Sequence, residues 1–115
     1  MIYALFQVAV GGAIGSVLRF LTITTVGAPL GTLIVNVAGS LVMGVFFASL
    51  SARLSPLLMT GVLGGFTTFA AFSLDALKLY ESGQAPQALL YIAGSVLLSL
   101  AAVALGAALA RGAFA

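Results

Sequence analysis

Long apolar runs, separated by single charged residues, dominate the chain. The uncharged stretches cover residues 1–18, 20–52, 54–74 and 82–110. Each is long enough for the roughly 20 apolar residues that a transmembrane helix needs. The second stretch is predicted to hold only one helix, because the turn-like segment 24–29 leaves a single helix's length after it. The pattern therefore predicts four membrane spans.

The predicted helices cover residues 2–22, 31–50, 57–79 and 86–110. Pro29, Pro56 and Pro86 each stand where one of the last three helices would begin, a position that tolerates the missing N–H of proline. Four spans consume about 80 positions, so the remainder is short loops and ends. We expect an all-α integral membrane protein with a single four-helix transmembrane domain over residues 1–115, held in a lipid bilayer.

The composition narrows the chemistry. Apolar residues make up 63% of the chain and charged residues only 5%, against about 25% charged in ordinary soluble domains. The chain has no Cys and no His, which excludes disulfides, thiolate nucleophiles and imidazole metal sites. No intramembrane nucleophile–base pair is present, so we do not expect an enzyme. The basic residues are scattered singly, so we expect no nucleic-acid partner.

The basic residues divide evenly between the two sides of the predicted bundle. Arg53 and Arg111 fall on the side that holds both termini, whereas Arg19 and Lys78 fall near the opposite side. The positive-inside rule therefore assigns no orientation. Insertion in both directions, and with it an antiparallel homodimer, is physically possible, while one orientation set by other factors remains open. Four thin helices leave most of each helix facing lipid, so we expect an oligomer.

Two predicted helices carry polar or small residues on one face. They recur at every fourth position: Thr32, Asn36, Ser40 and Gly44 in the second helix, and Tyr91, Ser95 and Ser99 in the fourth. Residues four apart share a helix face. In one interpretation the hydroxyls bond back to their own helix and Asn36 joins two helices. In the other, the two stripes line a narrow track of neutral hydrogen-bond donors for an ion or solute.

Glycines and threonines mark two further features. The pairs Gly11…Gly15 and Gly61…Gly65 have the small-xxx-small spacing that lets helix backbones approach closely in lipid. The segment 64–73 combines paired glycines and paired threonines at mid-span. Both residue types have low helix propensity, which disfavours a continuous helix there. A broken helix would free carbonyls for a cation and N–H groups for an anion. An unbroken helix with close glycine contacts is the alternative.

Aromatic and charged side chains add two candidate roles. Phe69 and Phe72 lie three apart and would usually contact lipid or core, but their positive ring edges could line an anion passage. No acidic residue lies at mid-span, since Asp75 and Glu81 fall near the end of the third helix. A proton- or cation-driven transporter would want an intramembrane carboxylate. Arg19, near the end of the first predicted helix, is expected to snorkel to the interface or to attract anions in a vestibule.

Three sequence blocks together resemble the small prokaryotic fluoride channels of the Fluc/CrcB type. The blocks are residues 11–20 (GGAIGSVLRF), 31–40 (GTLIVNVAGS) and 64–69 (GGFTTF). The likeness covers nearly the whole chain, in order and with suitable spacing. It implies a fluoride-selective channel that exports fluoride passively across the inner (cytoplasmic) membrane and gives fluoride resistance. It further implies a dual-topology antiparallel homodimer with two pores and a structural sodium ion at the dimer interface.

The resemblance also implies residue roles. The break in the third helix would let the backbone carbonyls of Gly64 and Thr67 from both subunits hold the sodium ion, in keeping with oxygen ligation of a hard cation. Asn36 would face fluoride. The other implied pore residues are the phenylalanines Phe69 and Phe72 and the polar track of Thr32, Tyr91, Ser95 and Ser99.

Two departures from the family pattern are visible. Ala70 and Ala71 stand where the family commonly has Ser and Thr, which removes two hydroxyls beside the first pore phenylalanine. Asp75 stands where Glu is usual, so the carboxylate sits on a shorter arm.

Two other classes of protein remain as alternatives. A small multidrug-resistance-like, proton-coupled exporter would also have four spans, but the first predicted helix lacks the carboxylate that it would need. A non-transporting membrane assembly protein would use the polar stripes only to join helices.

Overall fold

The chain folds into helices joined by short connections. The computed structural model describes residues 1–114. Its elements are α1 (Ile2–Val26), α2 (Leu30–Ser49), η1 (Pro56–Leu63), α3 (Gly64–Phe66), α4 (Phe69–Glu81) and α5 (Ala85–Phe114). Taken together, η1, α3 and α4 make one interrupted span. Four spans are long and apolar enough to cross a membrane, which confirms the predicted all-helical, four-span architecture.

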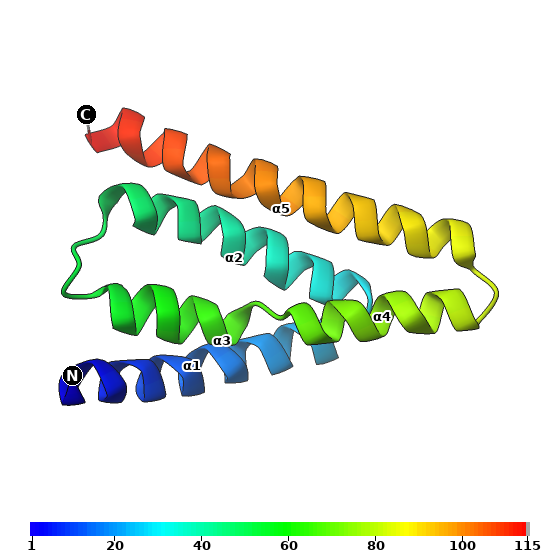
Figure 1. Ribbon diagram of the computed structural model, residues 1–115, viewed down its shortest axis with the longest axis horizontal. Coiled ribbons are helices and arrows are strands. Elements are labelled where there is room, and N and C mark those ends of the chain that lie inside the picture. Colours follow the sequence, from blue (N-terminus) through cyan, green and yellow to red (C-terminus); the bar gives the residue numbers. More distant parts are fainter. Residues whose placement is uncertain (115) are drawn as a thin grey trace.

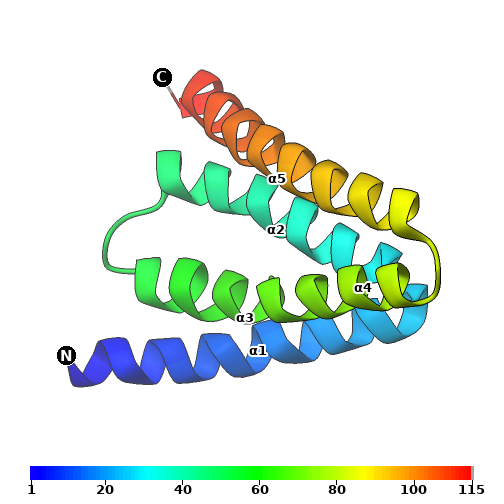
Figure 2. The same ribbon diagram turned by 45° about the vertical axis from the view of Figure 1, so that its right-hand side comes forward.

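The spans lie side by side and alternate in direction (Figure 1). Both termini and the 50–55 connection lie at one end of the bundle, and the connections at 27–29 and 82–84 lie at the other. In both views α2 lies between α5 and the interrupted span, and α1 packs against η1 and α3 (Figure 2). Helix α4 also contacts α5. This arrangement places α2, α4 and α5 around one side of the break.

Three helix ends differ from the prediction. Helix α1 continues past residue 22 to Val26, because the hydroxyl of Thr24 donates to the Phe20 carbonyl at 2.7 Å and is satisfied inside the helix. Gly27, with φ +92°, then ends it in the left-handed region that glycine favours. Helix α4 reaches Glu81 rather than 79, and α5 extends beyond the predicted 86–110. The π-helical turns of η1 had no signal in the sequence pattern.

Glycines bring the helix backbones into close contact. Gly11 and Gly15 face η1, and a Cβ on Gly15 would lie only 2.0 Å from the Val62 carbonyl oxygen. Gly44 of α2 meets α5 in the same way, with a Cβ 2.0 Å from the Val103 oxygen. Small-residue contacts of this kind stabilise helix pairs in lipid, where packing replaces the hydrophobic effect between helices. The tight packing predicted for Gly11 and Gly15 is confirmed.

Large apolar side chains point outward over most of the bundle. Phe6 on α1 and Leu90 on α5 are 66% and 72% exposed in the single chain. The interior holds small residues and a few larger ones such as Val35, Leu63 and Phe72. An apolar exterior of this extent is suited to lipid or to another protein surface. Function is therefore confined to the few polar groups between the helices.

Candidate functional site

The interruption of the third span lies at Thr67 and Thr68. Thr67 has φ −83° and ψ 155°, and Thr68 has φ −151° and ψ 120°, so both are extended between two helical segments. The backbone N–H and the hydroxyl of Thr67 both donate to the Leu63 carbonyl, at 3.0 and 2.9 Å. The break expected within the segment 64–73 is confirmed, and the unbroken alternative is wrong.

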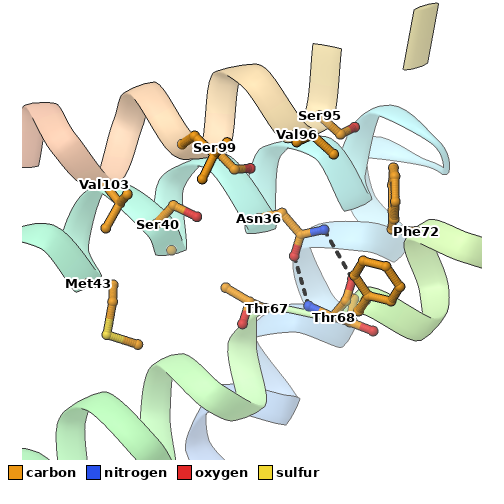
Figure 3. Close-up of a pocket in the computed structure, with 13 residues that line it drawn as sticks. Asn36, Ser40, Met43, Thr67, Thr68, Phe72, Ser95, Val96, Ser99 and Val103 are labelled. Atoms are coloured by element: carbon orange, nitrogen blue, oxygen red, sulfur yellow. Dashed lines mark hydrogen bonds between the residues drawn. The ribbon is translucent and has the colours of Figure 1, made fainter. Parts of the chain in front are cut away.

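The side chain of Asn36 on α2 bonds to the break at both backbone polar groups of Thr68. Its Nδ2 donates to the Thr68 carbonyl at 3.0 Å, and its Oδ1 accepts from the Thr68 backbone N–H at 2.8 Å (Figure 3). Because a backbone N–H can only donate, the orientation of the amide is fixed by this pair. Asn36 thus replaces the peptide partner that Thr68 would have in a continuous helix.

The break leaves several carbonyls without their usual helical partners, and those of Gly64 and Thr67 are among them. In a continuous α-helix the N–H of Thr68 would bond to the Gly64 carbonyl, and the N–H of Ala71 to the Thr67 carbonyl. Instead Asn36 accepts from Thr68, and the hydroxyl of Thr68 accepts from Ala71 at 3.2 Å as the N-cap of α4. Gly64 is also exposed on the surface of the chain. The two carbonyls freed from these bonds are those that the family resemblance assigns to sodium.

A groove opens beside the break, between α2, the start of α4 and α5 (Figure 3). Its volume is about 370 Å³. The residues lining it are Asn36, Gly39, Ser40, Met43, Thr67, Thr68, Phe69, Phe72, Ser95, Val96, Ser99, Leu100 and Val103. Every one of these side chains is uncharged. The groove brings together five of the predicted pore residues: Asn36, Phe69, Phe72, Ser95 and Ser99.

The aromatic side chains form a short series at one end of the groove. Phe69 is 78% exposed in the single chain, whereas Phe72 is 7% exposed. Their ring centroids lie 5.5 Å apart with the planes at 60°, and the rings of Phe72 and Tyr91 lie 5.3 Å apart at 44°. Tilted rings at this spacing present edges as well as faces to their surroundings. The series connects the open groove to the region around Tyr91.

A polar cluster lies on the far side of Phe72, outside the groove. Asp75 is only 8% exposed, and its Oδ2 accepts a hydrogen bond from the hydroxyl of Tyr91 at 3.3 Å. Two other hydroxyls, those of Thr32 and Ser95, are buried without a hydrogen-bond partner in the described part of the chain. Buried hydroxyls are normally satisfied by protein, water or a ligand. Ser95 is therefore available as a donor to a bound species, whereas the Thr32 hydroxyl lies close enough to the Tyr91 hydroxyl to bond with it.

Five predicted site residues do not line the groove: Thr32, Tyr91, Asp75, Gly64 and Arg19. Thr32 and Tyr91 lie outside it, at the polar cluster, and Arg19 on α1 does not line it. Because α1 continues to Val26, Arg19 lies about two turns inside the helix, rather than near its end as the sequence predicts.

Sequence reasoning did not identify the role of Thr68. The signal that could have found it is a threonine directly before a helical segment, the usual composition of an N-cap. The apolar lining residues Met43, Val96, Leu100 and Val103 carry no chemical signal of their own.

Comparison with known proteins adds independent information. Residues 6–107 match the family model described as CrcB-like protein, Camphor Resistance (CrcB). A protein of Paracoccus denitrificans named fluoride-specific ion channel FluC is 52% identical, and the match covers the whole of both chains. Relatives of the same name from Cereibacter sphaeroides and Rhizobium etli are 53% and 51% identical, over 97% and 92% of this chain and 98% and 94% of theirs.

Proposed function

Since the chain belongs to the CrcB family, which includes these fluoride-specific ion channels, we propose that it conducts fluoride passively and selectively across a membrane. It is a multi-pass membrane protein of a channel family, not an enzyme. The observation that carries the proposal is the groove beside the broken helix, which combines neutral donors with phenylalanine edges and has no charged lining residue among those described. We place the protein in the inner (cytoplasmic) membrane, where conduction lets fluoride leave the cell and gives fluoride resistance.

The groove offers what a small, strongly hydrated anion needs on leaving water. The amide of Asn36 and the hydroxyls of Ser95 and Ser99 replace water hydrogen bonds, and the positive ring edges of Phe69 and Phe72 line the path. Thr32 and Tyr91 continue the track beyond Phe72. The absence of fixed positive charge keeps binding weak enough for release. Narrowness and neutral donors, rather than bulk charge, would then exclude chloride.

We propose that two chains assemble as an antiparallel, dual-topology homodimer with two pores. The groove of a single chain is open on one side, and Phe69 is largely exposed beside it. A second chain would close this side and complete each path. The even division of Arg19, Arg53, Lys78 and Arg111 between the two sides supports insertion in both directions. Within such a dimer, residues 1–115 act as one transmembrane domain.

The freed carbonyls of Gly64 and Thr67 suit a structural sodium ion at the dimer interface. Sodium is a hard cation that prefers oxygen ligands, and two copies of the break supply four backbone carbonyls. Gly64 is exposed, so its carbonyl is accessible to a partner chain. The ion would neutralise the partial negative charge of the carbonyls and join the two chains. Exhaustive sodium removal is expected to lower dimer stability and fluoride flux, and unchanged values for both would contradict this assignment.

The direct test of function is fluoride release from liposomes that contain only this protein. Vesicles loaded with potassium fluoride are diluted into fluoride-free medium, and release is followed with a fluoride electrode after addition of a potassium ionophore. We expect rapid fluoride release with negligible release from matched chloride vesicles. A proton-coupled exporter would instead respond to a pH gradient, and a non-transporting assembly protein would release neither ion from well-folded preparations.

A further inference from the structure

We propose that Asn36 and Thr68 are positioning residues for the interfacial cation site. Their side chains capture the two backbone N–H groups that would otherwise bond to the carbonyls of Gly64 and Thr67. The carbonyls thereby stay free to hold the cation. The inference rests on the proposed sodium site, and it assigns the maintenance of that site to two side chains on the groove.

The Asn36 amide keeps the Thr68 N–H from bonding to the Gly64 carbonyl. An amide side chain presents one donor and one acceptor at nearly the spacing of a peptide group, and Asn36 uses both on Thr68, at 3.0 and 2.8 Å. An aliphatic side chain can form neither bond, and a hydroxyl, whose donor and acceptor share one oxygen, lacks the spacing of the amide. Thr68 is thus bound to α2 rather than to its own helix. Its backbone N–H donates to Asn36 and does not donate to the Gly64 carbonyl.

Thr68 supplies the second step through its own side chain. Its hydroxyl accepts from the Ala71 N–H at 3.2 Å, so that this N–H does not return to the Thr67 carbonyl. An extended residue with a side-chain oxygen is a stable helix N-cap, which explains why α4 begins here. The two captures act on neighbouring carbonyls of the same break.

The membrane environment increases the effect of these two side-chain hydrogen bonds. Backbone polar groups at membrane depth must be satisfied, because no bulk water is present to bond with them. If Asn36 no longer accepts from Thr68, that N–H needs another acceptor, and the carbonyl of Gly64 is its partner in a continuous helix. Closing that bond would extend α3 and remove one carbonyl from the cation. Cation affinity therefore depends on the side chain of a groove residue.

The same amide also links the cation site to the groove. Its Nδ2 carries two hydrogens, of which the bond to the Thr68 carbonyl uses one. Asn36 lines the groove, so the second hydrogen remains available to an anion there. One side chain can therefore hold the cation ligands in place and serve as a neutral donor to fluoride.

The test measures sodium binding separately from flux. The detergent-solubilised, full-length protein is titrated with sodium chloride at constant ionic strength, with N-methylglucamine as the replacement cation, and thermal unfolding is recorded at each concentration. The variants are Asn36→Leu, Thr68→Val and Thr68→Ser, with Ser95→Ala as the matched control. Ser95 is buried and polar, lines the same groove and makes no bond to the break.

We expect Asn36→Leu and Thr68→Val to raise the sodium concentration needed for half-maximal stabilisation by roughly 10- to 100-fold, the usual effect of removing a group that orients metal ligands. Thr68→Ser keeps the hydroxyl and should keep the parent's midpoint. Ser95→Ala should lower fluoride flux and leave the sodium midpoint unchanged. If Asn36→Leu does not fold, the nearly isosteric change Thr68→Val, compared with Thr68→Ser, still decides whether a side chain at the break positions the cation ligands.

Parent-like sodium midpoints in folded Asn36→Leu and Thr68→Val would overturn the inference, as would equal loss of the response in Ser95→Ala. A parent protein without any sodium response would also overturn it, while fluoride release from the same preparation would leave the channel function standing. A parent that responds to sodium but releases no fluoride would contradict the proposed function and leave the positioning role intact.

Discussion

At the residue scale, the proposed path would have to hold a small anion without a fixed charge. Asn36, Ser95 and Ser99 contribute neutral donors from two helices, and Phe69 and Phe72 border them. Buried hydroxyls without partners are uncommon in proteins, and among the described residues Ser95 has one that faces the groove. Donors left unpaired by the fold are available to an ion at no cost of breaking an internal bond. This availability is the physical basis of the proposed path.

Phe69→Ile tests the role of the ring edge. Phe69 is 78% exposed, so the substitution leaves the packing of the single chain almost unchanged. Loss of the positive edge is expected to reduce fluoride release by about tenfold, from the size of typical aromatic edge contacts. The measurement is electrode-detected release from proteoliposomes, with the assembly state checked by size-exclusion chromatography. Leu77→Ile, on the same helix and outside the groove, is the control; equal flux from both variants would remove Phe69 from the path.

Tyr91→Phe tests the polar cluster behind Phe72. The change removes the hydroxyl that donates to the buried carboxyl of Asp75 at 3.3 Å and keeps the ring that packs on Phe72. An unsatisfied buried acceptor costs about 1–3 kcal/mol, and we expect the lower part of this range because the bond is long. The free energy of unfolding in a denaturing-detergent titration gives the value. A variant as stable as the parent would show that Asp75 does not depend on this bond.

Sequence reasoning could identify which residue types carry the chemistry but not which bonds they form. The stripe spacing was enough to put Ser95 and Ser99 on one face of α5 and Asn36 on the polar face of α2, since residues four apart share a face. The two-sided bond from Asn36 to Thr68 depends on how two helices approach each other, a relation that local pattern does not carry. Both open interpretations of Asn36 therefore contribute: it joins two elements and also lines the groove.

At the element scale, glycines decide which helices can touch. Gly44 of α2 and Gly106 of α5 each lie against the other helix's backbone, with a Cβ position 2.0 Å from a carbonyl oxygen. Backbone atoms cannot move aside as a flexible side chain can. The pairing of α2 with α5, which forms two walls of the groove, depends on these positions.

Gly44→Ala is expected to destabilise the protein, and Gly94→Ala provides the matched control. The added methyl at Gly44 would meet the Val103 carbonyl, and overpacking of this kind costs about 1–3 kcal/mol. Gly94 on α5 has nothing within 4 Å of the added Cβ, so alanine there should be neutral or stabilising by up to about 1 kcal/mol. Thermal unfolding of both variants in the same detergent checks the difference. Equal melting temperatures would refute the close-packing account.

The element boundaries show where local pattern succeeds. Paired glycine and threonine at mid-span correctly indicated a weak point, because glycine lowers helix propensity. The pattern placed the end of α1 too early, because threonines that bond back to their own helix were treated as a turn; Thr24 is one of them. The π-helical geometry of η1, which packs against α1, leaves no signature in hydrophobic periodicity.

At the scale of the whole molecule, the even charge distribution and the one-sided groove point to the same assembly. A chain without orientation bias can insert in both directions, and a groove open on one side needs a second surface to close it. The proposed antiparallel pair would satisfy both conditions and would bring two breaks together.

Charge bias tests this assembly. Arg53→Gln with Arg111→Gln leaves basic residues on one side only, and Lys78→Gln with Ala52→Lys shifts the balance the other way. Each variant alone should insert in one orientation and lose the ability to protect fluoride-sensitive cells. Co-expression of the two should restore protection, because oppositely oriented chains can pair again. Full protection by either variant alone would rule out an antiparallel requirement.

The most direct measurement of the central claim is the reversal potential of currents across a bilayer that contains only this protein. With a tenfold fluoride gradient and equal chloride on both sides, a passive fluoride-selective channel should reverse near the fluoride equilibrium potential, about 59 mV, whatever the pH gradient. A reversal potential near zero, the equilibrium potential of chloride under these conditions, would show that chloride carries most of the current. A value that follows the proton gradient would show coupled transport, and either result would contradict passive fluoride conduction through the groove.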